Sequence, residues 1–106
     1  MARLATGLLV SALVRRAEAE GGGAMVLARG DATAGALLVQ LADRGVPGFL
    51  LERLLDPAGR YRWVPTGPGD DQRADYLSRR RRGDPDLWVI ELDHPEAARL
   101  VEEVAV

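Results

Sequence analysis

The sequence predicts an α+β domain in which helices cover an antiparallel sheet mainly on one face. Three observations support this prediction: helical periodicity near both ends, short apolar runs separated by glycine and proline turns in the middle, and one strongly apolar run late in the chain. The predicted order is α-β-β-β-β-α-β-α. Helices are expected at residues 6–20, 70–81 and 95–104, and strands at residues 24–29, 36–41, 49–55, 61–64 and 87–92.

The first helix is expected to begin with Thr6 as its N-cap and to end at Gly21-Gly22-Gly23, where glycine permits a left-handed conformation. Its apolar residues share one face, and Arg15-Arg16 closes the apolar run. This pattern favours a helix that packs on the core over the signal peptide that Met1-Ala2-Arg3 superficially suggests. The run is also too short to span a bilayer.

The middle of the chain is expected to form two hairpins. Residues 24–29 and 36–41 are expected to pair across a turn at residues 30–35. Residues 49–55 fit a helical stripe as well as a strand. We favour a strand, because turn-forming residues flank the run and Asp56-Pro57-Ala58-Gly59 matches a type I turn.

Composition excludes several classes of function. The 106 residues fit one domain spanning 1–106, and a net charge of −2 provides no global field that attracts nucleic acid or an anionic membrane. The chain has no cysteine and no lysine, which excludes thiolate metal sites, Schiff-base chemistry and a P-loop lysine. His94 is the single histidine, so multi-histidine metal sites are excluded too. We therefore predict no cofactor and no metal, and the lack of cysteine fits a cytoplasmic location.

Charge is most concentrated between Arg79 and Asp93, where a cationic run precedes an Asp-Pro-Asp turn and an apolar strand. Four consecutive helical residues point around the whole circumference, and cations suit a helix C-terminus, so a solvated helix end is the favoured interpretation. A phosphate or nucleic-acid patch is the alternative, possible in principle and not favoured. The candidate binding residues are Arg79, Arg80, Arg81, Arg82, Asp84, Asp86, Glu91 and Trp63.

A metal-dependent hydrolase is the second alternative, built on Asp84, Asp86, Glu91 or His94. The spacing has a faint similarity to metal nucleases of the proline-aspartate type. Those enzymes need a lysine two residues beyond the acid, and Asp93 occupies that place. A turn followed by a core strand is the better interpretation, so no catalytic residue is predicted.

Three segments carry a resemblance to a known family: Leu8 to Glu18, Arg29-Gly30-Asp31 with Ala34-Gly35, and Arg80 to Glu91 with its Asp-Pro-Asp-Leu-Trp-Val-Ile-Glu motif. The chain resembles a family of short uncharacterised bacterial proteins, chiefly alphaproteobacterial, that is catalogued as a domain of unknown function. The likeness covers nearly the whole chain. Residues 45–69 match less well, and Gly83 stands where an aromatic residue is more usual. The resemblance implies a soluble bacterial domain and assigns no activity.

The sequence therefore predicts a small non-catalytic binding or interaction domain whose partner is open. Unused strand edges and alanine-rich helix faces favour a homodimer, formed through a sheet edge or through the first helix.

Overall fold

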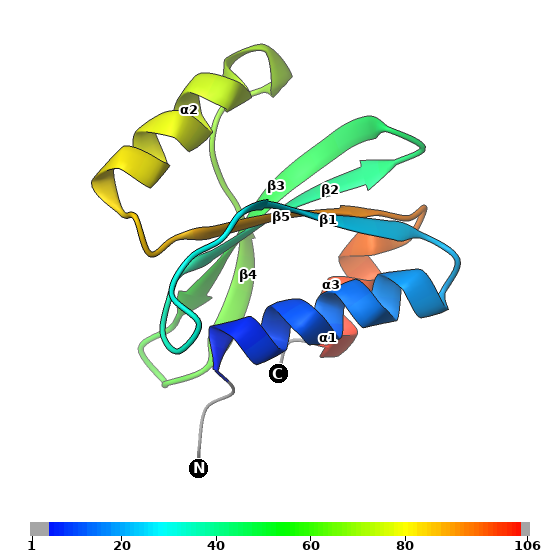
Figure 1. The fold of residues 1–106 in the computed structure, drawn as a ribbon, viewed down its shortest axis with the longest axis horizontal. Helices are drawn as coiled ribbons and strands as arrows, with labels where there is room; N and C mark the ends of the chain where they lie inside the picture. Colours follow the sequence, from blue (N-terminus) through cyan, green and yellow to red (C-terminus); the bar gives the residue numbers. More distant parts are fainter. Residues whose placement is uncertain (1–4, 105–106) are drawn as a thin grey trace.

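The structure is a computed structural model that describes residues 5–104, apart from the side chain of Asp70 (Figure 1). The pattern at Met1-Ala2-Arg3 that suggests a signal peptide lies outside the described residues. The α+β class and the predicted order of elements are confirmed. The elements are α1 (Thr6–Ala19), β1 (Gly23–Ala28), β2 (Leu37–Asp43), β3 (Val46–Leu55), β4 (Tyr61–Pro65), α2 (Asp70–Gly83), β5 (Trp88–Asp93) and α3 (Ala97–Val104).

The sheet has the strand order β1-β5-β2-β3-β4, and it is mixed where a wholly antiparallel sheet was expected. The pairing of β2 with β5 is parallel, whereas the other three pairings are antiparallel. The strand at residues 49–55 and its hairpin with β4 are confirmed. The predicted hairpin of residues 24–29 with 36–41 is wrong, because β5 lies between β1 and β2. A strand that is apolar on both faces is best buried with a neighbour on each side, and β5 has that composition.

Helices cover both faces of the sheet. Helices α1 and α3 pack on one face, while α2 lies across part of the other (Figure 1). Side chains alternate along β5 and the residue before it: Trp88, Ile90 and Leu92 face the larger core beneath α1 and α3, while Leu87 and Val89 belong to the smaller core. The buried residues of the smaller core are Leu38, Leu50, Leu87 and Val89, with Tyr76 and Leu77 of α2 packed against them.

Helix α1 begins one residue earlier than expected. Ala5 is its N-cap, and Thr6 is the first helical residue. The Thr6 hydroxyl instead donates a buried hydrogen bond of 2.8 Å to the Gly35 carbonyl, so it fastens the helix start to the loop after β1. The predicted glycine end is confirmed: Gly21 has φ +84°, and the Gly22 N–H donates to the Ala17 carbonyl at 2.9 Å.

The loop of residues 29–36, which we call the crossing loop, passes over the start of β5 and is bonded to it. The Trp88 indole Nε1–H donates to the Asp31 carbonyl at 2.8 Å, and the Asp31 N–H donates to the Asp86 carbonyl at 3.0 Å. A Cβ at Gly30 would stand 2.0 Å from the Asp86 oxygen, and one at Gly35 would stand 2.3 Å from it. Both positions therefore require glycine because the two backbones touch there.

We expect Gly30→Ala to lower the free energy of unfolding by about 1–3 kcal/mol, because the new methyl group forces the crossing loop away from β5. Gly23→Ala is the matched control, since no atom lies within 4 Å of its added Cβ. Urea unfolding of both variants measures the difference. Equal stabilities would show that the close approach is not a constraint.

Candidate functional site

The arginine run divides between side chains that hold the fold and side chains that are exposed. Arg80 forms a paired interaction with Glu52 of β3, with nitrogen–oxygen distances of 3.1 and 2.8 Å, and it also donates to the Tyr76 hydroxyl at 2.8 Å. The Glu52 carboxylate raises the pKa of Arg80 above its ordinary value. Arg80 therefore fastens α2 to the sheet.

Arg81 fastens the end of α2 to two other segments. Its Nη1 donates to the Arg29 carbonyl at 3.0 Å and to the Leu87 carbonyl at 3.1 Å. Arg79 and Arg82 are exposed. Because Arg80 reaches β3 while Arg81 reaches β5 and the crossing loop, the four guanidinium groups do not converge on one point.

The aspartates around β5 organise turns. The Asp84 carboxylate accepts from the Asp86 N–H at 3.1 Å and so closes the turn before β5. The Asp93 carboxylate accepts from the N–H groups of Arg44 and Gly45, both at 2.8 Å, and holds the turn between β2 and β3. Each of these carboxylates thus has a structural role that its position in the fold explains.

The described residues bring together no group of three acidic or histidine side chains able to hold a metal ion. Glu91 is half-buried on β5 and pairs in register with Met25 of β1.

His94 uses both ring nitrogens in the fold: Nδ1 accepts from the Glu96 N–H at 2.9 Å, so Nε2–H donates to the Glu20 carbonyl at 3.1 Å. His94 therefore connects the end of α1 to the start of α3.

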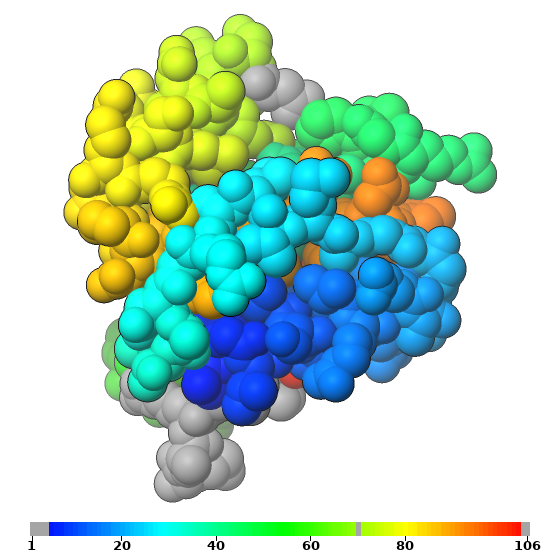
Figure 2. Space-filling view, in the orientation of Figure 1, coloured from blue at the N-terminus to red at the C-terminus, as the bar shows by residue number. Residues whose placement is uncertain are grey.

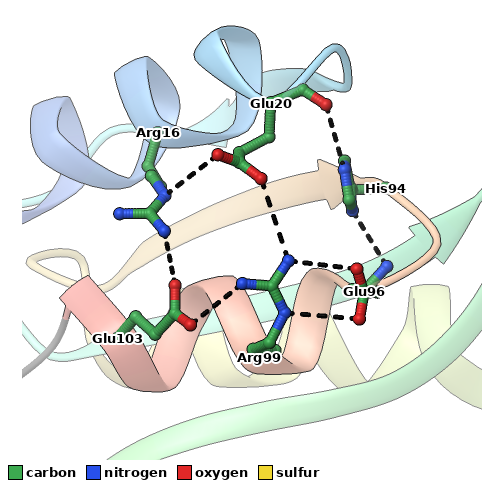
Figure 3. A network of polar contacts seen from close by, with 6 residues as sticks. All are labelled: Arg16, Glu20, His94, Glu96, Arg99 and Glu103. Atoms are coloured by element: carbon green, nitrogen blue, oxygen red, sulfur yellow. Dashed lines mark hydrogen bonds and ion pairs between the residues drawn. The ribbon is translucent and has the colours of Figure 1, made fainter.

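Ion pairs join α1 to α3 beside His94 (Figure 3). Arg16 of α1 binds Glu103 of α3, while Arg99 binds Glu96 at 3.0 Å and Glu103 at 2.9 Å. The Arg99 guanidinium lowers the pKa of the Glu96 carboxyl. Exposed pairs of this kind hold two surface helices in register and contribute modestly to stability.

The two tryptophans lie in different surroundings. Trp63 on β4 is half-buried against the larger core, and its buried indole Nε1–H donates no hydrogen bond to the described residues. Trp88 is almost fully buried, and the Arg29 guanidinium carbon lies 5.3 Å from its ring centroid. Trp88 therefore both fills the core and positions Arg29 at the surface.

Sequence reasoning named a sheet edge as a binding surface without saying which strand forms it, and the structure places β1 at a free edge. Met25, Val26 and Leu27 are exposed there by 59, 38 and 47%. An open groove lies on each side of the strand's second half. One, the α1-side groove, lies between β1 and α1, and the other, the α2-side groove, lies between β1 and α2. Figure 2 shows this segment in cyan at the front of the molecule, with α1 in blue below and α2 in yellow above.

Fold and site together define a small α+β domain with a helix-flanked sheet edge. The family model described as "Protein of unknown function (DUF1491)" matches residues 4–102, and the chain belongs to this family. A crystal structure of a DUF1491 family protein from Caulobacter crescentus is 34% identical, with 92% of this chain and 94% of that chain covered and a TM-score of 0.82.

Two solution structures are also similar. An NMR structure of a DUF1491 family protein from Caulobacter crescentus is 36% identical, with 94% of each chain covered and a TM-score of 0.77. A protein from A. tumefaciens is 32% identical, with 93% of this chain and 92% of that chain covered and a TM-score of 0.68. No curated protein matches the chain.

Among the described residues, no helix has the length and apolar character that crossing a membrane requires.

We expect Arg80→Gln to lower the free energy of unfolding by about 1–3 kcal/mol, since it leaves the mostly buried Glu52 carboxylate without its partner. Arg79→Gln, one helical position away and exposed, should stay within about 0.5 kcal/mol of the parent protein. Urea unfolding compares the two. If Arg79→Gln costs as much as Arg80→Gln, the division of the arginine run is incorrect.

Proposed function

We propose that this protein is a non-catalytic binding domain that accepts an extended segment of another protein along the free edge of β1. The observation that carries the proposal is the pair of grooves on the two sides of this edge strand. An edge strand presents N–H and C=O groups that pair with an added strand. Side chains of that added strand point alternately to the two faces of the sheet. They would therefore enter the α1-side and α2-side grooves in turn.

The opposite edge of the sheet is less suited to this role. Strand β4 is a five-residue strand that ends at Pro65, which has no N–H to donate. Strand β1 contains no proline, and three successive apolar side chains are exposed along it. These differences favour β1 as the binding edge.

A second copy of the chain is the competing occupant, and it corresponds to the homodimer that the sequence predicts. The register of β1 against β5 shifts between Val26 and Ala28, which marks a β-bulge. A bulge disrupts pairing along an edge, and a pair of identical β1 strands would contain two bulges, whereas β1 paired with a regular added strand contains one. We therefore favour a heterologous segment, and the mass in solution separates the two occupants.

The nucleic-acid alternative through Arg79 to Arg82 has weaker support. Arg80 and Arg81 are engaged with Glu52 and with backbone carbonyls, which leaves two exposed guanidinium groups from the run. Affinity for nucleic acid rises with the number of phosphates neutralised, so a run whose guanidinium groups reach different segments of the fold provides little binding as a unit.

The test uses blocked synthetic peptides of about ten residues that alternate apolar and polar positions and carry glutamate, glutamine or lysine at the polar positions. With ¹⁵N-labelled protein, we expect at least one peptide to shift the amide resonances of β1 and to slow their hydrogen exchange. Leu27→Ser should weaken that binding about tenfold, because the exposed Leu27 side chain would be buried by the peptide and the substitution removes this apolar contact.

The matched control is Leu54→Ser on β3, where the leucine is exposed by 44% and lies outside both grooves. It should leave binding unchanged. The proposal is overturned if no peptide perturbs β1, or if the control weakens binding as much as Leu27→Ser. A dimer in light scattering that Leu27→Ser dissociates would assign the edge to a second copy instead.

A further inference from the structure

We infer that the segment bound at β1 is acidic, with two neighbouring apolar residues beside two neighbouring carboxylates. This inference rests on the proposed function and names the chemistry of the partner. Its basis is that every charged side chain lining the two grooves is an arginine, although the whole chain has a net charge of −2. Arg15 and Arg29 line the α1-side groove, and Arg81 and Arg82 line the α2-side groove.

The α1-side groove combines an apolar floor with two cations. Val10, Val26 and Trp88 contribute to its floor, and Arg15 projects from α1 beside it. The Arg29 guanidinium is held near the Trp88 ring at 5.3 Å, so its position is set before a ligand arrives. Such a groove suits an apolar side chain followed on the same face by a carboxylate.

The Asp31 carboxylate, although close in sequence to Arg29, is bonded to backbone N–H groups within the crossing loop. It accepts from the N–H groups of Thr33 and Ala34, at 3.2 and 2.8 Å. Asp31 is also absent from the residues that line either groove. The bonds of Asp31 do not involve the Arg29 guanidinium, which lines the α1-side groove and keeps its N–H donors for a carboxylate.

The α2-side groove repeats the combination on the other face. Leu27, Leu77 and Val89 give its apolar part, and Arg81 and Arg82 give its cations. Arg81 is anchored through Nη1 to two backbone carbonyls. A guanidinium group has five N–H donors, so an anchored arginine retains donors for a carboxylate.

Strand alternation converts the two grooves into a sequence pattern. Residues i and i+2 of an added strand share one face, while i+1 and i+3 share the other. Each face of the added strand would supply one apolar residue and one carboxylate. The apolar residues would then be i and i+1 and the carboxylates i+2 and i+3, which gives the order apolar-apolar-acidic-acidic in one chain direction. The strands at the two edges of this sheet, Gly23–Ala28 and Tyr61–Pro65, contain no acidic residue. Edge pairing with a second copy would thus bring more arginines to the site and no carboxylate.

The experiment titrates the ¹⁵N-labelled full chain with a capped Val-Val-Glu-Glu peptide extended by two serines at each end, and with its Val-Val-Gln-Gln counterpart. We expect the glutamate peptide to bind at β1 at least about tenfold more tightly. The preference should shrink between about 50 mM and about 300 mM salt, because exposed charges are screened. The double variant Arg15→Gln/Arg82→Gln should reduce the preference to about twofold or less.

Arg79→Gln is the matched control, because Arg79 is an exposed arginine that lines neither groove. It should retain the preference, and urea unfolding should show that the double variant is folded. If both peptides bind equally at β1, the acidic preference is wrong and the proposed binding edge stands. If neither perturbs β1, the proposed function itself fails. An oligothymidylate that shifts the same β1 amides more strongly than the glutamate peptide would overturn the inference in favour of nucleic acid.

Discussion

The fold depends on one close contact, where the crossing loop passes over the first residues of β5. The Trp88 indole donates to the Asp31 carbonyl, and glycine at positions 30 and 35 lets the two backbones touch. This crossing places β5 between β1 and β2, so that β5, which is buried along most of its length, has a neighbour on each side. The same crossing leaves β1 at the edge. The free edge is therefore a consequence of burying β5.

Two of the three segments that carry the family resemblance meet at this contact, and the third, Leu8 to Glu18, begins directly after the α1 residues bonded there. The loop with Arg29-Gly30-Asp31, the strand start with Trp88 and the beginning of α1 are joined by hydrogen bonds, including the one from Thr6 to Gly35. Arg81 adds α2 to the same cluster by binding the Arg29 and Leu87 carbonyls. These contacts give the most recognisable residues of the chain a role in its architecture. Membership of the family therefore indicates a shared structure and leaves the activity to the surface that this structure presents.

Local patterns in the sequence predicted the elements well, whereas they failed on the pairing of strands. The apolar run at residues 87–92 and the turn residues before it located β5, because both signals depend on immediate neighbours in the chain. The hairpin of β1 with β2 was wrong because adjacency in sequence was taken as adjacency in the sheet. Even the six residues 30–35 between the two predicted strands exceed the usual hairpin turn, and this length was the available signal for a crossing; the observed connection, residues 29–36, is longer still. Within the candidate site, Arg81 and Arg82 were identified from their charge, but Arg15 and Arg29 come from distant segments that only the fold brings to one edge.

Binding and stability can be separated in this molecule because they use different atoms of the same region. Trp88 and Gly30 hold the crossing, so changing them disturbs the fold and the β1 edge together. Leu27, Arg15 and Arg82 are exposed at the grooves, so replacing them alters the surface while the crossing is kept. Arg81 belongs to both groups, since it anchors α2 through its Nη1 and lines the α2-side groove. A carboxylate that binds Arg81 would reinforce the junction of α2 with the crossing loop, and ligand binding would in this way stabilise the contact that creates the edge.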